Sequence, residues 1–285
     1  KRTTMTTNKV GIIGQGFVGT AVREGLKQHF TIETYDHEQS KSTCASLKEL
    51  TSLVDIMFLC LPTPMLKSGE CDISIVDDTI FKINSYGKHK TVILKSTVPP
   101  GTTKLLNNKY ENVNVIFNPE FLTEANFIND FKNQQRIIIG SCNLRTPTVT
   151  NIFKTVFPNV PIINTSSTVA ECVKYYTNTF LSTKVSFANE FKQLCDKINV
   201  DYNEVVEYSL YDKRIGKTHL SVPGPDGNLG FGGSCFPKDV NALVFYMKQV
   251  GITPTVLNAV WDKNLEVRPQ KDWENLIGRA VSTKE

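Results

Sequence analysis

An apolar run close to the start of the chain is followed at once by three regularly spaced glycines. Residues 10–13 form an expected strand, and residues 14–19 read GQGFVG, which fits GxGxxG and opens a helical pattern. In this context the pattern is the dinucleotide-binding fingerprint. Gly14 makes the tight turn, Gly16 admits a pyrophosphate to the helix N-terminus, and Gly19 lets helix and strand pack closely. The pattern predicts a Rossmann-type domain.

The next expected strand, residues 31–35, brings a carboxylate to the same site. Asp36 follows this strand. It stands about 20 residues after the glycines, where an acidic side chain accepts hydrogen bonds from the adenosine ribose and repels a 2′-phosphate. The sequence therefore predicts NAD rather than NADP as the cofactor.

Further strands alternate with helical patterns along the first half of the chain. Strands are expected at residues 55–59, 91–94, 113–117 and 136–139, with a helical pattern at 73–83. Such alternation predicts a doubly wound parallel sheet, in which ligands bind beyond the carboxyl ends of the strands. The segments that follow three of these strands are therefore candidates for a site, although Pro, Thr and Asn there could simply end strands and cap helices.

A long helix is expected to open the second half of the chain. From residue 166 to about residue 198 there is neither Gly nor Pro, and apolar residues recur at steps of three and four. At 1.5 Å per residue this helix would extend about 48 Å. Lys174 and Asn178 stand one turn apart, so their side chains emerge from the same face. They could line a site or belong to a polar surface stripe.

Residues 230–239, reading GFGGSCFPKD, hold a candidate nucleophile. Pro237 suits the first turn of a helix, which places Cys235 at the helix N-terminus. The partial positive charge of that end and the ammonium of Lys238 would stabilise a thiolate. A buried, inert cysteine before an ordinary helix is the alternative.

Composition limits the classes of protein to be considered. The chain has 285 residues, enough for two domains, and its net charge of +4 is not gathered in a Lys/Arg block, so nucleic acid is not an expected partner. No apolar run is long enough to span a bilayer, and no membrane partner is expected. Seven cysteines without metal-ligand spacing indicate free thiols in the cytoplasm and no metal site.

Several of these segments resemble the UDP-glucose/GDP-mannose dehydrogenase family. The segment 230–239 is similar to the family's active-site signature, and Lys174 with Asn178 matches its KxxxN pair. Strand-end motifs are matched at 61–64, 96–103 and 118–124, and an RIG segment at 214–216. The resemblance implies NAD-dependent oxidation of the C6 alcohol of a nucleotide sugar, UDP-glucose to UDP-glucuronate above all, for polysaccharide biosynthesis. Two hydride transfers would pass through a cysteine thiohemiacetal and a thioester.

The family's functional positions carry over one by one. The implied catalytic residues are the nucleophile Cys235 with Lys174, Asp239, Asn178, Glu120 and Thr97. The implied cofactor contacts are Gly14, Gly16, Phe17, Val18, Gly19, Asp36, Lys41, Thr63, Thr97, Glu124 and Lys238. The implied substrate contacts are Glu120, Phe121, Leu122, Lys174, Asn178, Arg214, Phe231 and Gly232. On charge alone, Lys41 could instead be a solvated lysine, and Glu120 with Glu124 a solvated acidic face.

The predicted organisation is an α/β Rossmann domain at residues 1–165, an all-helical central domain at 166–268 and a tail at 269–285. In the resembled family the long helix packs in a homodimer, and Arg214 can reach a neighbouring subunit's substrate. Family members also continue into a third domain that binds much of the UDP. The residues after 268 are too few for a domain, so the chain is expected to be a piece of a longer protein or a natural short form.

Two other functions are compatible with these patterns. A two-electron hydroxyacid dehydrogenase can share a Rossmann domain followed by helices, but it would not need Cys235. A non-catalytic NAD-binding dimer would bind the cofactor without forming NADH.

Overall fold

The computed structural model describes residues 8–144 and 146–284, and it divides into two compact units. The first unit comprises the residues up to Thr63 together with Ile73–Lys174, and the second comprises Pro64–Asp72 and the residues from Tyr175 onward. Residues 1–7 of the predicted first domain lie outside the described residues. This division differs from the predicted one, because the segment 64–72 belongs to the second unit and the first turns of the long helix belong to the first.

The first unit is built on a seven-stranded sheet. All six expected strands are present, and a seventh follows them. The strands are β1 (Lys9–Ile13), β2 (Thr31–Tyr35), β3 (Ile56–Leu59), β4 (Lys90–Leu94), β5 (Val113–Phe117), β6 (Ile137–Ser141) and β7 (Ile162–Ser166). Their order in the sheet is β2-β1-β3-β4-β5-β6-β7. The seventh strand escaped prediction because it is an edge strand with an exposed, polar second half.

The sheet is mostly parallel, as expected, and it departs from the parallel arrangement at one junction. The strands β1 to β5 are parallel, but β6 pairs antiparallel with β5, and β7 pairs parallel with β6. A parallel return needs a crossover that carries the chain back along the strand. The only helix between β5 and β6 is α5 (Phe127–Lys132), whose six residues span about 9 Å, less than the roughly 16 Å of a five-residue strand.

Helices cover both faces of the sheet, as a doubly wound fold requires. One core contains side chains of α2 (Leu47–Leu53), α3 (Ser74–Ser85) and α4 (Thr102–Lys109). The other contains side chains of α1 (Phe17–Leu26), α5 and α6 (Pro147–Val156). Neighbouring residues of a strand enter opposite cores, as Met57 and Phe58 of β3 do, because successive side chains of a strand point to opposite faces.

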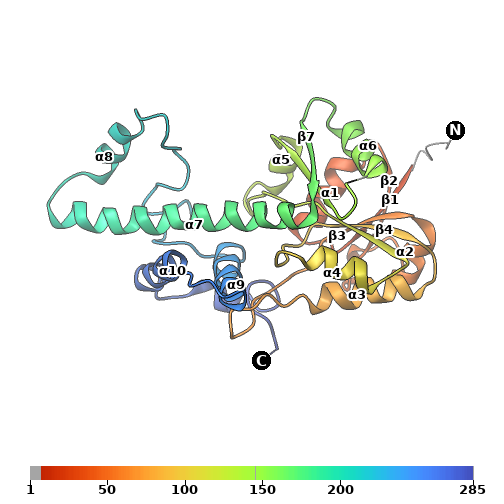
Figure 1. Cartoon of the computed structure of the whole chain (residues 1–285). Helices are drawn as coiled ribbons and strands as arrows, with labels where there is room; N and C mark the ends of the chain where they lie inside the picture. Colours follow the sequence, from red (N-terminus) through yellow and green to blue (C-terminus); the bar gives the residue numbers. More distant parts are fainter. Residues whose placement is uncertain (1–7, 145, 285) are drawn as a thin grey trace. The chain divides into compact units, whose positions relative to one another are not determined.

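The long helix α7 spans Ser167–Lys197 without interruption, within one residue of the predicted ends at 166 and 198 (Figure 1). Its first turns belong to the first unit, where Ala170 is fully buried in the core. Glu171, also fully buried, accepts hydrogen bonds from Gly101 N (2.6 Å), Thr103 N (2.8 Å) and Thr103 Oγ1 (2.6 Å). This carboxylate caps the N-terminus of α4, and it is one reason why the first turns of α7 group with the sheet.

The second unit is helical. Beyond α7 it contains α8 (Tyr202–Ser209), α9 (Phe236–Gln249), α10 (Thr255–Val267) and the short 3₁₀ helix η2 (Asp272–Asn275). The residues expected to form a tail are packed into this unit. Trp273 is buried against Trp261, with ring centroids 5.2 Å apart. Val281 and Met65 form a β-bridge that joins the segment 64–72 to the end of the chain.

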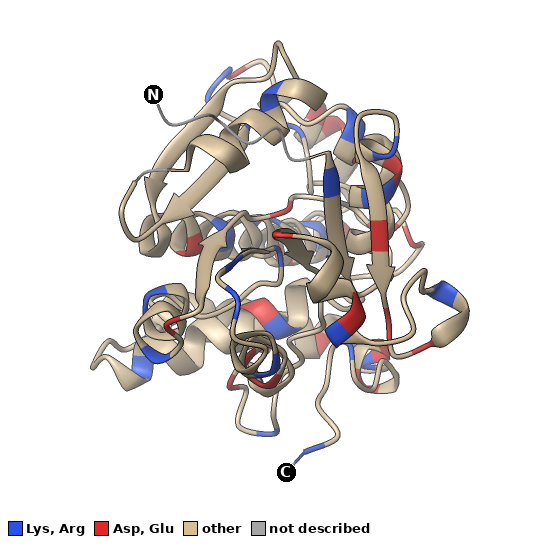
Figure 2. Cartoon of the chain, turned by 90° about the vertical axis from the view of Figure 1, so that its right-hand side faces the viewer, with Lys and Arg blue, Asp and Glu red and all other residues tan. Residues whose placement is uncertain are grey.

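Two further observations concern the kind of surface the chain presents. In Figure 2, basic and acidic residues are interspersed along the ribbon. Across residues 8–144 and 146–284, no helix combines the length and apolar character needed to cross a membrane. Within the same residues, no cluster of three or more His, Cys, Asp or Glu side chains could hold a metal ion.

Candidate active site

The glycine turn after β1 has the backbone expected of a dinucleotide site. Gly14 has a φ of 87°, and a Cβ there would clash with the carbonyl oxygen of Cys60. A Cβ on Gly19 would clash with the carbonyl oxygen of Gly14, which explains the close packing of helix α1. In contrast, no heavy atom outside Gly16 and its two chain neighbours lies within 4 Å of the position that a Cβ of Gly16 would take. The turn therefore leaves open the place where the fingerprint admits a pyrophosphate.

Asp36 lies directly after β2 and helps to shape this turn. Its carboxylate accepts hydrogen bonds from Gln15 N at 2.6 Å and from Glu38 N at 2.9 Å. Burial alone would raise the pKa of Asp36, but these backbone donors outweigh it and hold the pKa below its usual value. The carboxylate is therefore ionised at neutral pH and keeps lone pairs for ribose hydroxyls. The residues present fit NAD.

The remaining cofactor positions of the first unit are placed as follows. Phe17 opens α1 and packs on Phe127, with ring centroids 5.3 Å apart, and Val18 follows it, half-buried. Lys41 is exposed and pairs with Glu38 at 2.5 Å. Its side chain therefore makes the contact of a solvated lysine, and its contact with the cofactor stays a prediction.

Polar side chains meet at the carboxyl ends of β3, β4 and β5, as the topology predicts. Thr63 Oγ1 donates to Thr97 O at 2.7 Å. Lys95, 3% exposed, donates to Asn118 Oδ1 at 2.8 Å, and Asn118 Nδ2 donates to Ile138 O at 2.7 Å. Burial lowers the pKa of Lys95 to about 8. This lysine, which sequence reasoning missed, anchors the start of the segment that contains Glu120.

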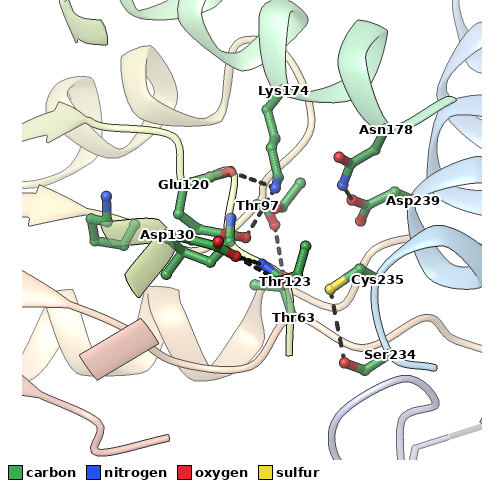
Figure 3. Close-up of polar contacts among 12 residues, drawn as sticks. Thr63, Thr97, Glu120, Thr123, Asp130, Lys174, Asn178, Ser234, Cys235 and Asp239 are labelled. Atoms are coloured by element: carbon green, nitrogen blue, oxygen red, sulfur yellow. Dashed lines mark hydrogen bonds and ion pairs between the residues drawn. The ribbon is translucent and has the colours of Figure 1, made fainter. Parts of the chain in front are cut away.

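Glu120 and Lys174 form a buried ion pair (Figure 3). Lys174 Nζ donates to Glu120 Oε1 at 2.9 Å and to the carbonyl oxygen of Glu120 at 2.6 Å. The two side chains are 10% and 4% exposed. Burial would raise the pKa of Glu120, but the Lys174 ammonium and the Leu122 backbone N–H keep it below its usual value. The pair is a fixed ammonium beside an ionised carboxylate, as stabilisation of a negative oxygen requires.

The ring of Phe121 contacts two cations. Lys174 Nζ is 5.5 Å from the centroid of its ring, and the guanidinium of Arg136 is 4.4 Å away. Such cation–π contacts hold the segment 120–122 in place. Sequence reasoning missed Arg136, although a cation that directly precedes an apolar strand was the available signal. Leu122 donates its backbone N–H to Glu120 Oε2 at 2.7 Å, whereas Glu124 is exposed.

In the second unit, Cys235 stands at the N-cap of α9, with Pro237 in the first turn, so the predicted placement is correct. Asp239, 1% exposed, accepts a hydrogen bond from Asn178 Nδ2 at 2.6 Å (Figure 3). It also forms an ion pair with Lys238 at 2.5 Å. Burial would lower the pKa of Lys238, but the charges of Asp239 and Cys235 raise it. Lys238 therefore stays protonated next to the thiol. The contact of Lys238 with the cofactor stays a prediction.

The glycine-rich backbone before Cys235 is held by side chains that lie far along the chain. Asn264 Oδ1 accepts from Phe231 N at 2.7 Å, and Asn264 Nδ2 donates to Phe231 O at 2.9 Å. Asp272 accepts from Gly233 N at 3.1 Å and from Arg268 Nε at 2.5 Å. Asn264 lies in α10, Arg268 directly follows that helix and Asp272 begins η2, so helical spacing in the sequence gave no signal for this group.

Two of the predicted substrate-binding residues, Phe231 and Gly232, are packed closely by neighbouring side chains. Phe231 is buried, and its ring packs in a cluster with Val240 and Val260. A Cβ on Gly232 would lie 2.4 Å from Arg268 Nη2 and from Asp272 Oδ2, so these side chains would have to shift to admit one. Arg214 is placed apart from this network, with its side chain 89% exposed and paired with Asp212.

Helix α7 contributes Lys174, which pairs with Glu120, and Asn178, which contacts Asp239. Lys174 is the last residue of the first unit, and Asn178 stands one turn later in the second. Because α7 is continuous between them, the two side chains leave the same face of the helix.

Comparison with known proteins identifies two domains of one family. Residues 34–159 match the NAD binding domain of the UDP-glucose/GDP-mannose dehydrogenase family, and residues 168–266 match its central domain. The chain belongs to this family. Membership confirms the resemblance seen in the sequence, the Rossmann-type fold and NAD as the cofactor of the first domain.

Individual members of the family agree with this assignment. The chain is 38% identical over 265 residues to UDP-glucose 6-dehydrogenase of Rickettsia bellii, covering 90% of this chain and 58% of the relative. For TuaD of Bacillus subtilis the identity is 35%, covering 75% of this chain and 47% of the relative. The chain thus spans about half the length of the curated relatives it matches.

Solved structures give the same fold. A UDP-glucose dehydrogenase from Pyrobaculum islandicum superposes with a TM-score of 0.82 at 27% identity, covering 96% of this chain and 71% of that structure. The fold also matches 3-hydroxyisobutyrate dehydrogenase of Mycobacterium tuberculosis, with a TM-score of 0.73 at 13% identity. That match covers 93% of this chain and 95% of the other. The fold alone therefore does not distinguish the two reactions, and the side chains must do so.

Proposed function

We propose that this chain carries out the chemistry of an NAD-dependent nucleotide-sugar 6-dehydrogenase, with UDP-glucose as the substrate. The observation that carries the proposal is the position of Cys235 at the N-cap of α9, beside the Lys238–Asp239–Asn178 cluster. A two-electron hydroxyacid dehydrogenase has no use for a nucleophilic thiol there. The relatives named UDP-glucose 6-dehydrogenase support the choice of sugar.

In the proposed reaction, C6 of the sugar is oxidised twice. NAD, held by the glycine turn and Asp36, supplies the hydride acceptor for each of two oxidations. Lys174 stabilises the oxygen of the C6 alcohol as its proton leaves to water, and an aldehyde results. The Cys235 thiolate then adds to the aldehyde carbon and gives a thiohemiacetal, a species that can lose a second hydride.

Loss of that hydride leaves a thioester on Cys235, and water completes the cycle. A carboxylate, either Glu120 or Asp239, takes a proton from the water as its oxygen attacks the thioester carbon. The carbon–sulfur bond breaks, the thiolate of Cys235 is restored and the sugar acid leaves. In sum, one alcohol and one water become one carboxylate, with two hydrides transferred and three protons released.

The test is the number of NADH molecules formed per limiting UDP-glucose by the purified chain, with GDP-mannose and UDP-N-acetylglucosamine measured alongside. Two NADH per sugar are expected. Cys235→Ser should abolish the second oxidation, whereas Cys142→Ser, which alters an exposed cysteine of the first unit, should leave the stoichiometry unchanged. One NADH per sugar would exclude the thioester route, and none on any sugar would refute the proposed function.

We also propose that the chain forms a homodimer through α7. One face of this helix carries apolar side chains, each at least 36% exposed. They are Tyr176, Phe180, Phe187, Phe191 and Leu194, and Ile198 continues the series directly after the helix. Their steps of three, four and seven residues are those of a helix-pairing seam, and exposed apolar patches of this kind mark interfaces. The exposed Arg214 would then be available to reach the substrate of a neighbouring subunit.

Sedimentation velocity tests the dimer. Phe187→Glu should shift the chain to monomer, while Tyr208→Glu, which changes an exposed aromatic residue outside the seam, should not. A dimer that resists Phe187→Glu would place the interface elsewhere.

All seven cysteines are free thiols, which supports a reducing compartment and therefore the cytoplasm as the proposed location.

A further inference from the structure

The segment after residue 268 supplies a carboxylate to the backbone that precedes the nucleophile. Asp272 opens η2, and its side chain accepts the backbone N–H of Gly233, two residues before Cys235, at 3.1 Å. Trp273, which follows Asp272 in the chain, is 1% exposed, and its ring packs on that of Trp261. The packing of Trp273 therefore fixes the base of the Asp272 side chain within the second unit.

The position of this contact differs from that of the other contacts that hold the same backbone. Asn189 accepts from Gly230 N at 3.2 Å, and Asn264 pairs with the backbone of the residue after Gly230. Asp272 acts three residues later, at Gly233, whose φ of 71° lies in the left-handed region that favours glycine. A turn at this point leads directly into α9. Of these three side chains, Asp272 therefore holds the residue nearest to the nucleophile.

A second aspartate shares one partner with Asp272 and allows a comparison. Arg268 is 3% exposed, and its Nε donates to Asp272 Oδ1 at 2.5 Å while its Nη2 donates to Asp226 Oδ2 at 2.7 Å. Both carboxylates therefore neutralise the same buried guanidinium. Asp226 also accepts the backbone N–H of Asn228 at 3.1 Å, whereas Asp272 accepts that of Gly233. The two aspartates thus share the ion pair and differ in the backbone that they hold.

We propose that Asp272 is a positioning residue for Cys235, because by holding Gly233 it keeps the sulfur at the start of α9 and directed at C6 of the sugar. This inference rests on the proposed function, since it takes Cys235 as the residue that bonds to C6. The first oxidation needs no sulfur, so a displaced Cys235 would leave it intact. The addition of the thiolate to the aldehyde carbon, and with it the second hydride transfer, would slow.

A direct effect of the Asp272 charge on the thiol makes the opposite prediction. Removal of a negative charge near a thiol favours the thiolate, so the pH at which Cys235 is half-reactive would fall. Loss of position would instead take the sulfur away from the partial positive charge of the helix start, and this pH would rise. Lys238, whose charge interacts with Cys235, is present in every variant used. The direction of the shift therefore separates the two roles.

The first test follows the alkylation of Cys235 by iodoacetamide as a function of pH, without any ligand, by mass spectrometry of the peptide that contains it. In Asp272→Ala the midpoint of the profile should rise by about half a unit, the shift expected when a thiolate loses the partial charge of a helix N-terminus. Asp226→Ala is the matched control, because it removes the other carboxylate from Arg268, and its midpoint should not rise. Asp272→Asn, which keeps an acceptor oxygen for Gly233 N, should give an intermediate value. A midpoint that falls or stays in place in Asp272→Ala would overturn the proposal.

The second test is a single turnover of UDP-glucose, with the chain in excess over the sugar and NAD saturating. In Asp272→Ala the rate of the first NADH should change little, whereas the rate of the second should fall about ten- to hundredfold, as expected for a misplaced reacting group. In Asp226→Ala the ratio of the two rates should match that of the unmodified chain. A purely structural role of Asp272 would slow both oxidations together, and that result would overturn the proposal.

The two tests separate this inference from the proposed function. If no NADH forms on any sugar but the alkylation midpoint rises in Asp272→Ala and not in Asp226→Ala, Asp272 positions Cys235 and the proposed function fails. If two NADH form per sugar and Asp272→Ala matches the unmodified chain in both tests, the proposed function stands and the positioning role is wrong.

Discussion

In Asn264→Ala, the backbone of Phe231 loses both of its side-chain partners at once. Asn264 is fully buried, and its amide occupies the N–H of Phe231 at 2.7 Å and the C=O at 2.9 Å. Alanine leaves this donor and this acceptor unpaired in the interior. Each such group costs about 1–3 kcal/mol, so a rigid backbone would lose about 2–6 kcal/mol.

The glycine-rich backbone can relax, and this sets where in that range the effect should fall. Gly230 and Gly233 flank Phe231 with φ values of 66° and 71°, so the segment can turn the released groups toward water. We therefore expect a loss of about 2–3 kcal/mol in the free energy of unfolding. If the same free energy separates the competent and released positions of the segment before Cys235, kcat/KM for UDP-glucose falls about 30- to 150-fold.

Urea unfolding and steady-state kinetics would measure the two effects. Asn107→Ala is the control, because Asn107 makes the same pair of contacts with Val115 N (2.9 Å) and Val115 O (2.8 Å) in the first unit. It should destabilise the chain by a similar amount with a much smaller effect on the reactivity of Cys235. Equal losses of activity in the two variants, or an Asn264→Ala chain as stable as the unmodified one, would refute the reasoning.

Three further changes test other parts of the site. Lys174→Met should lower the free energy of unfolding by about 3–5 kcal/mol, because it leaves the buried carboxylate of Glu120 without a counter-charge. In urea unfolding, the double variant with Glu120→Gln should recover most of this loss, and no recovery would contradict the pairing. Glu171→Ala should lower the free energy of unfolding by about 2–4 kcal/mol, because three donors at the start of α4 lose their acceptor. Slower amide exchange at Thr103 in this variant than in the unmodified chain would exclude the cap. Burial lowers the pKa of Lys95 to about 8, so between about pH 8 and its unfolded value of 10.5 the unfolded chain binds more protons and stability rises with pH. Measured against Lys95→Met, the free energy of unfolding of the unmodified chain should rise by roughly 3 kcal/mol at most over this pH range. An equal pH dependence of stability in the unmodified chain and in Lys95→Met would contradict the prediction.

The parts of the site that could be predicted from sequence are those whose cause is local. The glycine turn, Asp36 and the position of Cys235 each depend on residues within one strand, turn or helix start. For this reason GxGxxG after an apolar strand and Pro237 after Cys235 were sufficient signals. The length of α7 was predictable for the same reason, because the absence of Gly and Pro is a property of the segment itself.

The parts that could not be predicted depend on contacts between distant residues. Asn264 holds a backbone 33 residues away, and the Lys95 ammonium is paired with Asn118, 23 residues away. A lone asparagine or lysine carries no sign of such a partner. The antiparallel pairing of β5 and β6 depends on the short α5, and the packing of the segment after residue 268 depends on the contact between Trp273 and Trp261. Both features depend on tertiary contacts, which the periodicity of the sequence does not reveal.

The ion pair of Glu120 and Lys174 suggests how one carboxylate could be ionised and inert in the free enzyme yet act as a base later. An ammonium has three donors, and among the described residues Lys174 directs them to two oxygens, both of Glu120. In the proposed reaction a substrate oxygen that gains negative charge competes for this ammonium. As Lys174 turns toward that oxygen, the carboxylate loses the charge that holds its pKa down, while its burial, which raises the pKa, remains. Glu120 would then become a stronger base at the stage at which water must attack the thioester.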